Sequence, residues 1–203
     1  ILAPMSPNSL NTSLEALRRS LEGDLFSDET YRVLHATDAS AYRELPLAVA
    51  RPKTPEDIRK LVTFALENGT SLIARTAGTS LAGQVVGDGI VVDVSKYLNN
   101  ILEINAEERW VRVEPGVVLD ELNMAVARHG LFFGPETSTS NRCMIGGMVG
   151  NNACGAHSII YGSTRDHLIS LKAILSDGSD AEFKPLTPEE FEYIKLHPIK
   201  GEE

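Results

Sequence analysis

The chain has few of the residues that build disulfide scaffolds, zinc sites or membrane spans. Only two of its 203 residues are cysteine, Cys143 and Cys154, and they lack the C-x-x-C spacing of a zinc site. No apolar run approaches the ~20 residues that a membrane helix needs. No charged segment precedes an apolar one as in a secretory signal peptide. These absences predict a location in the cytoplasm, a reducing compartment.

Positive charge is also scarce. The chain has 19 Lys and Arg against 28 Asp and Glu, a formal net charge of -9. Such an excess of negative charge repels a phosphate backbone, so we expect no nucleic acid as partner. An anionic ligand would have to be met by main-chain N–H donors instead of a basic surface.

The two ends of the sequence are unusual. It begins at Ile1 without an initiator Met and stops within a charged, helix-like stretch, residues 188–203. These features predict a fragment of a longer polypeptide. The alternative is a small complete protein that has lost its Met.

Hydrophobic spacing predicts a first lobe of mixed helix and strand. Four leucines from Leu10 to Leu21 recur at helical spacing and predict a peripheral opening helix, whereas residues 24–43 show no period. A helix is expected from Pro55 to Asn68, with Thr54 as N-cap and Asp57 reaching back to it. Short apolar strands are expected around this helix, at residues 47–50, 71–74 and 90–93.

A second lobe is expected beyond about residue 100. The pattern predicts two hairpins, at residues 101–113 and 168–184, a helix at 118–128 between them, and a terminal helix from Pro188. The fold class is therefore α+β in two lobes. The expected division is an N-terminal helical extension (1–44), a ligand-binding domain (45–185, lobes 45–100 and 101–185) and the start of a connection to a missing domain (186–203).

The first glycine loop, residues 74–84, lies between two expected strands and reads ARTAGTSLAGQ. Small residues let the main chain approach an anion closely, and consecutive N–H groups can point into one concavity. A Walker loop would need Lys and then Ser or Thr after Gly83, but Gln84 and Val85 stand there. The loop thus favours an anion site of another kind, with a solvated turn as the alternative.

The second glycine stretch, residues 143–155, reads CMIGGMVGNNACG. A Rossmann fingerprint would need glycine where Ile145 stands, so that fold is not expected. The stretch suits a short helix with a small face formed by Gly146, Gly147 and Gly150, and close helix–sheet packing without a ligand is the alternative. Two such segments favour a large dinucleotide held without Rossmann geometry.

An ordered set of short motifs carries a resemblance to a known family. The motifs are Asp38-Ala39-Ser40, Pro52 with its helix, Gly78 to Gly83, Glu114 to Val117, Ile145-Gly146-Gly147, Asn152 to Gly155, Tyr161-Gly162 and Asp177-Gly178. From about Thr37 to Phe183 the chain resembles FAD-binding domains of the PCMH type, in the vanillyl-alcohol-oxidase superfamily. It is most similar to flavin-linked D-2-hydroxy acid dehydrogenases, which act on D-lactate, glycolate or D-2-hydroxyglutarate.

The resemblance implies a set of FAD-binding residues. The loop from Arg75 to Ser80 would offer main-chain amides to the FAD pyrophosphate, two later stretches would line the ribityl chain and the isoalloxazine edge, and Ile174 would lie near the adenine. The expected residues are Arg75, Thr76, Ala77, Gly78, Thr79, Ser80, Pro135, Glu136, Thr137, Ser138, Gly146, Gly147, Val149, Gly150, Asn151, Asn152, Gly155 and Ile174. No catalytic residue and no metal ligand is expected among them. The family often has more glycine in the first loop, where this chain has Thr76, Ala77, Ser80 and Gln84, and often a glycine in place of Cys154.

The resemblance also bears on how the flavin is attached. Some superfamily members bind flavin covalently through a His in the first loop, where this chain has Thr79. We therefore expect noncovalent FAD, with Cys143 and Cys154 as small buried residues. The sequence leaves the roles of two side chains undecided. Arg75 could meet a phosphate or neutralise Asp93, and His157 could lie near the flavin or serve a structural role.

The implied activity is oxidation of a D-2-hydroxy acid such as D-lactate or glycolate, with hydride transfer to flavin N5. The family places its substrate-binding Arg and catalytic His in a domain that follows, so this fragment is expected to be inactive alone. The alternatives are a non-catalytic flavin-binding subunit and an enzyme similar to UDP-N-acetylenolpyruvoylglucosamine reductase.

Overall fold

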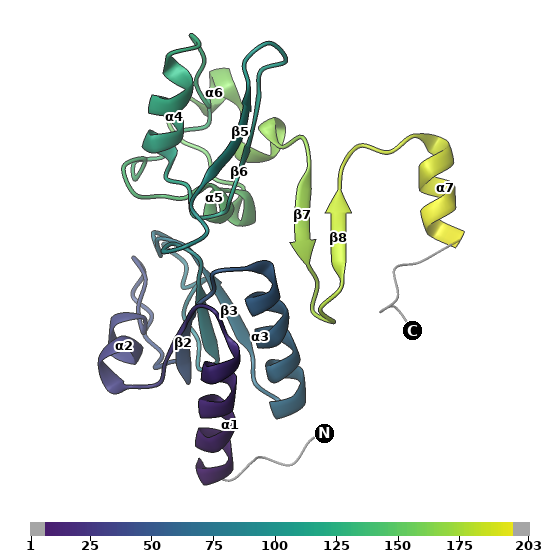
Figure 1. The fold of residues 1–203 in the computed structure, drawn as a ribbon. Coiled ribbons are helices and arrows are strands. Elements are labelled where there is room, and N and C mark those ends of the chain that lie inside the picture. Colours follow the sequence, from purple (N-terminus) through teal and green to yellow (C-terminus); the bar gives the residue numbers. More distant parts are fainter. Residues whose placement is uncertain (1–6, 197–203) are drawn as a thin grey trace.

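The computed structural model describes residues 7–196, which form two lobes and a projecting hairpin (Figure 1). The elements of the first lobe are α1 (Pro7–Ser20), β1 (Asp24–Phe26), α2 (Glu29–Leu34), β2 (Ala48–Arg51), α3 (Pro55–Asn68), β3 (Leu72–Arg75) and β4 (Ile90–Asp93). Those of the second lobe are β5 (Ile101–Asn105), β6 (Trp110–Val113), α4 (Leu119–Ala127), α5 (Ile145–Asn151), α6 (Ser158–Tyr161) and a 3-10 helix, η1 (Thr164–His167). The chain continues through β7 (Leu171–Ile174), β8 (Asp180–Phe183) and α7 (Pro188–Leu196).

The first lobe is built on one sheet with the strand order β1-β2-β4-β3. Strands β2, β4 and β3 run parallel, and β1 pairs antiparallel with β2. Strand β4 is buried along its whole length, as expected for the centre of a covered parallel sheet. The carboxyl ends of three parallel strands therefore lie at one edge, from which the first glycine loop departs.

Helix α1 differs from its expected peripheral role. Leu14 and Leu17 are 3% and 7% exposed and share one apolar cluster with α3 and the sheet. The carboxylate of Asp57 fixes this arrangement. Instead of reaching back to its own helix cap, it accepts N–H groups from Glu22 (2.9 Å), Gly23 (3.0 Å) and Lys53 (2.9 Å). It thereby joins the turn after α1 to the start of α3.

The segment without a sequence period, residues 24–43, contains β1 and α2. The rings of Phe26 and Tyr31 stack with centroids 3.6 Å apart, and the Arg51 guanidinium lies over both. Both elements are short, so their hydrophobic pattern repeats too few times to be recognised.

The second lobe has two small apolar clusters. One joins Val117, Leu122 and Val126 to the β5–β6 hairpin, and the other joins Leu119, Cys143 and Met148 around α5. The hairpins and the helices α3, α4 and α7 agree with the sequence prediction. Helix α6 was not foreseen.

The β7–β8 hairpin projects from the second lobe, and α7 lies beyond it (Figure 1). The hairpin contacts α3 of the first lobe, where Arg59 Nη2 donates to both carboxylate oxygens of Asp180 at 2.7 Å. Of the helices within residues 7–196, none is long and apolar enough to cross a membrane.

Candidate functional site

The first glycine loop leaves main-chain donors unpaired. The N–H groups of the five successive residues Thr76–Ser80 find no acceptor within residues 7–196, and all five residues are half-buried. These five donors are therefore free to bind an acceptor from outside the described residues. Consecutive unpaired N–H groups in a bent loop can together bind an anion.

The opposite side of this loop is held by the segment 35–39. Ala39 N–H donates to Gly78 O at 3.1 Å, and Arg75 Nη1 donates to Thr37 O at 2.8 Å and to His35 O at 3.4 Å. Gly78 has φ +66, and a Cβ there would lie 2.5 Å from Arg75 Nη2. The left-handed backbone favours glycine at this position, and any larger residue would also have to displace the Arg75 guanidinium.

The Arg75 side chain therefore lies behind the loop. It forms no ion pair within 4 Å with Asp93, whose neutralisation was one of the two expectations, although the charge of Asp93 acts on it. The Asp93 carboxylate instead pairs with Arg51 Nε at 3.3 Å and His35 Nε2 at 3.4 Å. Burial lowers the pKa of Arg75, and the charges of Asp93 and Asp38 oppose that shift.

Asp93 gives the base of the loop a fixed negative charge. Burial would raise the pKa of this carboxyl, but hydrogen bonds from His35 and Ser95 and the charge of Arg51 outweigh burial and lower the pKa to about 2. Asp93 is thus ionised at neutral pH, at the end of β4 and directly beneath the loop.

Helix α5 brings the second glycine stretch against the first loop. A Cβ on Gly147 would collide with Thr76 Oγ1, and Gln84 Nε2 donates to Asn151 Oδ1 at 2.7 Å. A Cβ on Gly146 would lie 2.5 Å from that of Pro115. Gly146 and Gly147 thus pack closely against neighbouring segments. Gly150 is exposed and has no atom within 4 Å of its Cβ position.

Residues 135–138 pack against the end of the second glycine stretch. A Cβ on Gly155 would collide with Glu136 O, and His157 Nδ1 pairs with Glu136 Oε1. Thr137 Oγ1 donates to Cys143 Sγ at 3.2 Å. Pro135 is buried and Ser138 is exposed. The two stretches expected to line one ligand are thus neighbours.

The other expected site residues are placed as follows. Val149 is half-buried on α5, and the side chain of Asn152 accepts Arg165 N–H at 2.9 Å. Ile174 lies half-buried in β7, on a hairpin that contacts α3. Cys143 is buried as expected, but Cys154 is exposed. No group of three or more His, Cys, Asp or Glu within residues 7–196 is placed to hold a metal ion.

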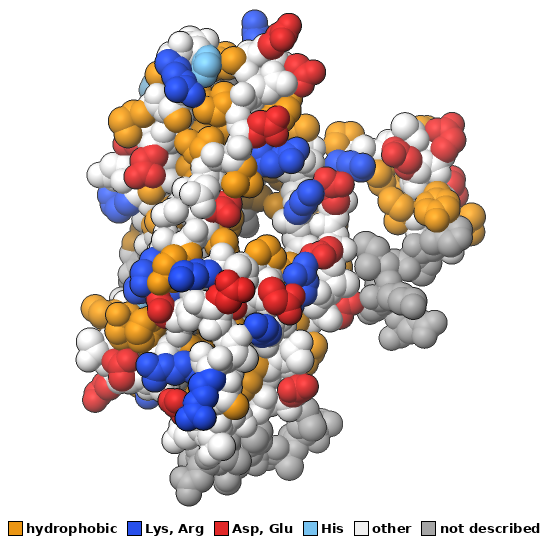
Figure 2. All heavy atoms as spheres, in the orientation of Figure 1, with side chains coloured by type: hydrophobic (Ala, Val, Ile, Leu, Met, Phe, Trp, Pro, Cys, Tyr) orange, Lys and Arg blue, Asp and Glu red, His pale blue; other side chains and the backbone are white. Residues whose placement is uncertain are grey.

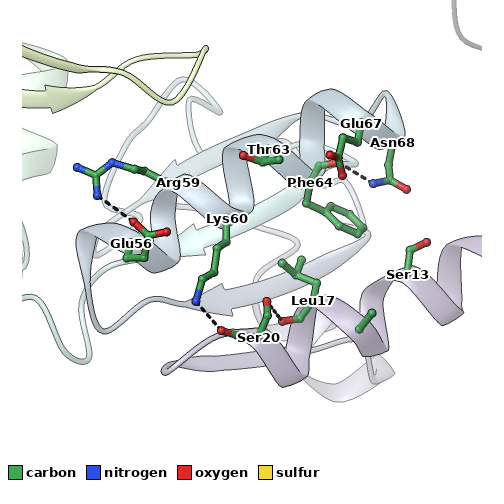
Figure 3. A pocket seen from close by; sticks show the side chains of 11 residues that line it. Ser13, Leu17, Ser20, Glu56, Arg59, Lys60, Thr63, Phe64, Glu67 and Asn68 are labelled. Carbon is green, nitrogen blue, oxygen red and sulfur yellow. Dashed lines mark hydrogen bonds and ion pairs between the residues drawn. The ribbon is translucent and has the colours of Figure 1, made fainter.

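Two surface pockets lie outside residues 76–80. A groove of about 540 Å³ runs between α1 and α3 (Figure 3), where Lys60 Nζ donates to Ser20 O at 2.6 Å and Arg59 pairs with Glu56 at 3.3 Å. A smaller pocket of about 260 Å³ adjoins the first glycine loop and is lined by Tyr42, Arg43, Glu44, Ala82, Gly83 and Val86. The two cations of the groove are already bonded, and neither pocket is predictable from the sequence pattern.

The site therefore offers main-chain donors rather than charge. On the face shown in Figure 2, Lys and Arg side chains are interspersed with Asp and Glu. The first loop has unpaired amides, small residues and a close glycine-rich helix. These features fit a phosphate-bearing ligand that needs close main-chain approach.

Known proteins resemble this chain over most of its length. Residues 46–183 match the family described as FAD binding domain. A D-2-hydroxyglutarate dehydrogenase of Pseudomonas putida is 46% identical over 177 residues, covering 85% of this chain and 18% of that protein. The glycolate oxidase subunit GlcD of Bacillus subtilis is 34% identical over 149 residues, covering 72% of this chain and 32% of that protein. The chain thus spans about a fifth to a third of the length of these relatives.

Solved structures support the fold. An alkyldihydroxyacetonephosphate synthase superposes with a TM-score of 0.77 at 18% identity, covering 96% of this chain and 38% of the other. A p-cresol methylhydroxylase superposes with a TM-score of 0.77 at 16% identity, covering 88% and 36%. The expected α+β, two-lobed fold of the PCMH type is confirmed. This chain belongs to the FAD binding domain family.

Proposed function

We propose that the chain is the FAD-binding domain of a flavin-linked oxidoreductase that oxidises a D-2-hydroxy acid such as D-lactate or glycolate. The observation that carries the proposal is the row of unpaired amides from Thr76 to Ser80. The relatives named as D-2-hydroxyglutarate dehydrogenase and glycolate oxidase subunit support the substrate class.

In this proposal the amides of Thr76–Ser80 donate to the pyrophosphate of FAD. Residues 135–138 and 146–155 line the ribityl chain and the edge of the ring. Gly150 supports this assignment, because its exposed Cα and the open space around it leave room for a cofactor. Ile174, half-buried in β7, is proposed to lie near the adenine.

Bound FAD would supply the hydride acceptor, N5, as the hydroxy acid loses its α-hydrogen as hydride and its hydroxyl proton to a base, giving the 2-oxo acid. The residues described above bind and orient the cofactor. We propose that the base and the group that binds the substrate carboxylate lie elsewhere in the full polypeptide, so residues 1–203 bind FAD but do not turn over substrate. The domain boundaries and the cytoplasmic location remain predictions.

We also propose that FAD is held without a covalent bond. Thr79, at the position where some superfamily members have histidine, is half-buried in the first glycine loop. The buried Cys143 Sγ contacts Thr137 Oγ1 at 3.2 Å and Met148 Sδ at 3.7 Å. Acid precipitation of the saturated protein should leave the flavin in the supernatant, and flavin retained in the pellet would refute this attachment.

The binding proposal is tested by titrating the chain with FAD while following quenching of flavin fluorescence. We expect a saturable curve that ADP shifts by competition, because ADP shares the diphosphate. Riboflavin, which lacks phosphate, should bind far more weakly. A linear response up to about 1 mM FAD would overturn the proposal, since it corresponds to less than ~4 kcal/mol of binding free energy.

A further inference from the structure

Arg75 occupies an unusual position for a cation at an anion site. Its guanidinium lies beneath Gly78, donates to two main-chain carbonyls of the segment 35–39, and is half-buried. The same segment returns a hydrogen bond to the loop, from Ala39 N–H to Gly78 O at 3.1 Å. The first glycine loop and the segment 35–39 are thus joined by hydrogen bonds from the Arg75 side chain and by one main-chain hydrogen bond.

Two carboxylates act on the guanidinium of Arg75. Asp93 is the register partner of Arg75 in the sheet, and the charges of Asp93 and Asp38 both act on Arg75. Asp38 Oδ1 accepts Ser40 N–H at 2.8 Å, while Asp38 Oδ2 is buried and has no hydrogen-bond partner among the described residues. A sealed carboxylate oxygen near a half-buried cation is stabilised by that cation's field.

We propose that Arg75 is a positioning residue that braces the first glycine loop from behind and does not contact the phosphates. This inference rests on the proposed function. In it, the side chain fixes the curvature that aims the amides of Thr76–Ser80 into one concavity. The anion is met by main-chain donors alone.

The brace depends on the shape of the arginine side chain as well as on its charge. A guanidinium is a planar fork with five N–H donors and can hold two carbonyls while its face lies against Gly78. A lysine ammonium is a compact point charge that cannot fill the same plane. Lysine is, however, a good ligand for phosphate, so Arg75→Lys separates the two roles.

The experiment compares Arg75→Lys and Arg75→Met with the wild-type chain of 203 residues. FAD affinity is measured at about 20 mM and about 0.5 M NaCl, because salt screens an exposed charge pair much more than a buried brace. Amide hydrogen exchange at Ala39 is measured on the same proteins. We expect about tenfold or greater loss of affinity in both variants, equal at the two salt concentrations, and about tenfold faster exchange at Ala39.

The matched control is Arg51→Met, a second partly buried arginine at the same sheet edge, which pairs with Asp93 and does not touch the loop. It should lower thermal stability but leave FAD affinity and Ala39 exchange within about twofold of wild type. If Arg75→Lys keeps wild-type affinity, or if the loss in Arg75→Met disappears at high salt, Arg75 is a phosphate ligand and the brace is refuted. If wild-type protein does not bind FAD, the proposed function fails, and Ala39 exchange alone then decides whether the brace exists.

Discussion

The first glycine loop and the second glycine stretch have similar compositions but use their glycines differently. In the first, the amides of Thr76–Ser80 are unpaired and Gly78 lets the chain bend at φ +66. In the second, Gly146 N–H donates to Pro115 O at 2.8 Å, and the missing side chains of Gly146 and Gly147 make room for neighbouring segments. Glycine content therefore does not identify a binding loop. The state of the main-chain donors does.

The two regions also pack on different kinds of side chain. Beneath the first loop lie the charges of Arg75 and Asp93, whereas α5 rests on the apolar cluster of Leu119, Cys143 and Met148. The first loop should therefore respond to pH and to charge removal. The second should respond to changes of side-chain volume.

The largest expected effect is on Gly78. Gly78→Val forces a β-branched residue into a left-handed conformation and into the Arg75 guanidinium, so FAD affinity should fall at least about tenfold. Gly130→Val is the control, because Gly130 has a similar φ of +69 at the end of α4 with no atom within 4 Å of its Cβ position. A fluorescence titration compares them. Equal losses in both variants would mean that strain alone, not this loop, controls binding.

A smaller effect is expected from Asp93→Asn, measured by urea unfolding at several pH values. The pKa of Asp93 is lowered to about 2 from its ordinary value of 3.8, so its charge stabilises the fold above about pH 4. This contribution is lost as the pH falls through about 2. The variant should be about 2 kcal/mol less stable than wild type near neutral pH, with the difference shrinking toward zero in acid. Cys143→Ala, which alters the apolar cluster beneath α5, should destabilise the fold by an amount that does not change over that pH range. A constant difference for Asp93→Asn would contradict the claim that the charge of Asp93 stabilises the fold.

The smallest effects are expected within α5. Gly147→Ala should destabilise the fold by about 1 kcal/mol, because the new methyl group must displace Thr76. Gly150→Ala should stabilise it by about 0.5 kcal/mol, because its Cβ position is open and alanine favours helix. Thermal unfolding without FAD gives both values. If both signs were reversed, so that Gly147→Ala stabilised the fold and Gly150→Ala destabilised it, α5 would not pack on the first loop.

The strongly patterned parts of the fold were predictable from the sequence. Helix α3 follows from its apolar stripe, from Thr54 as N-cap and from Gly69, which adopts φ 61 at its end. The role of Asp57 was not predictable, because its three donors come from two segments that only the tertiary fold brings together. Strand β1 and helix α2 were too short for their periodicity to show.

The candidate site was predictable as a set of segments but not as a geometry. The sequence shows where small residues cluster, and the fold brings the first loop and α5 together as a dinucleotide site would require. The sequence does not show which amides stay unpaired or that Gly150 faces open space. Nor does it show that the Arg75 guanidinium turns toward Thr37, because these depend on neighbours far away in the sequence.

Amide hydrogen exchange with and without saturating FAD reports directly on the first glycine loop. We expect the amides of Thr76–Ser80, unpaired in the free protein, to become protected when FAD binds. The amide of Met148, which already donates to Met144 O at 2.9 Å, should change little. Saturable FAD binding that leaves exchange at Thr76–Ser80 unchanged would contradict the claim that these amides hold the pyrophosphate.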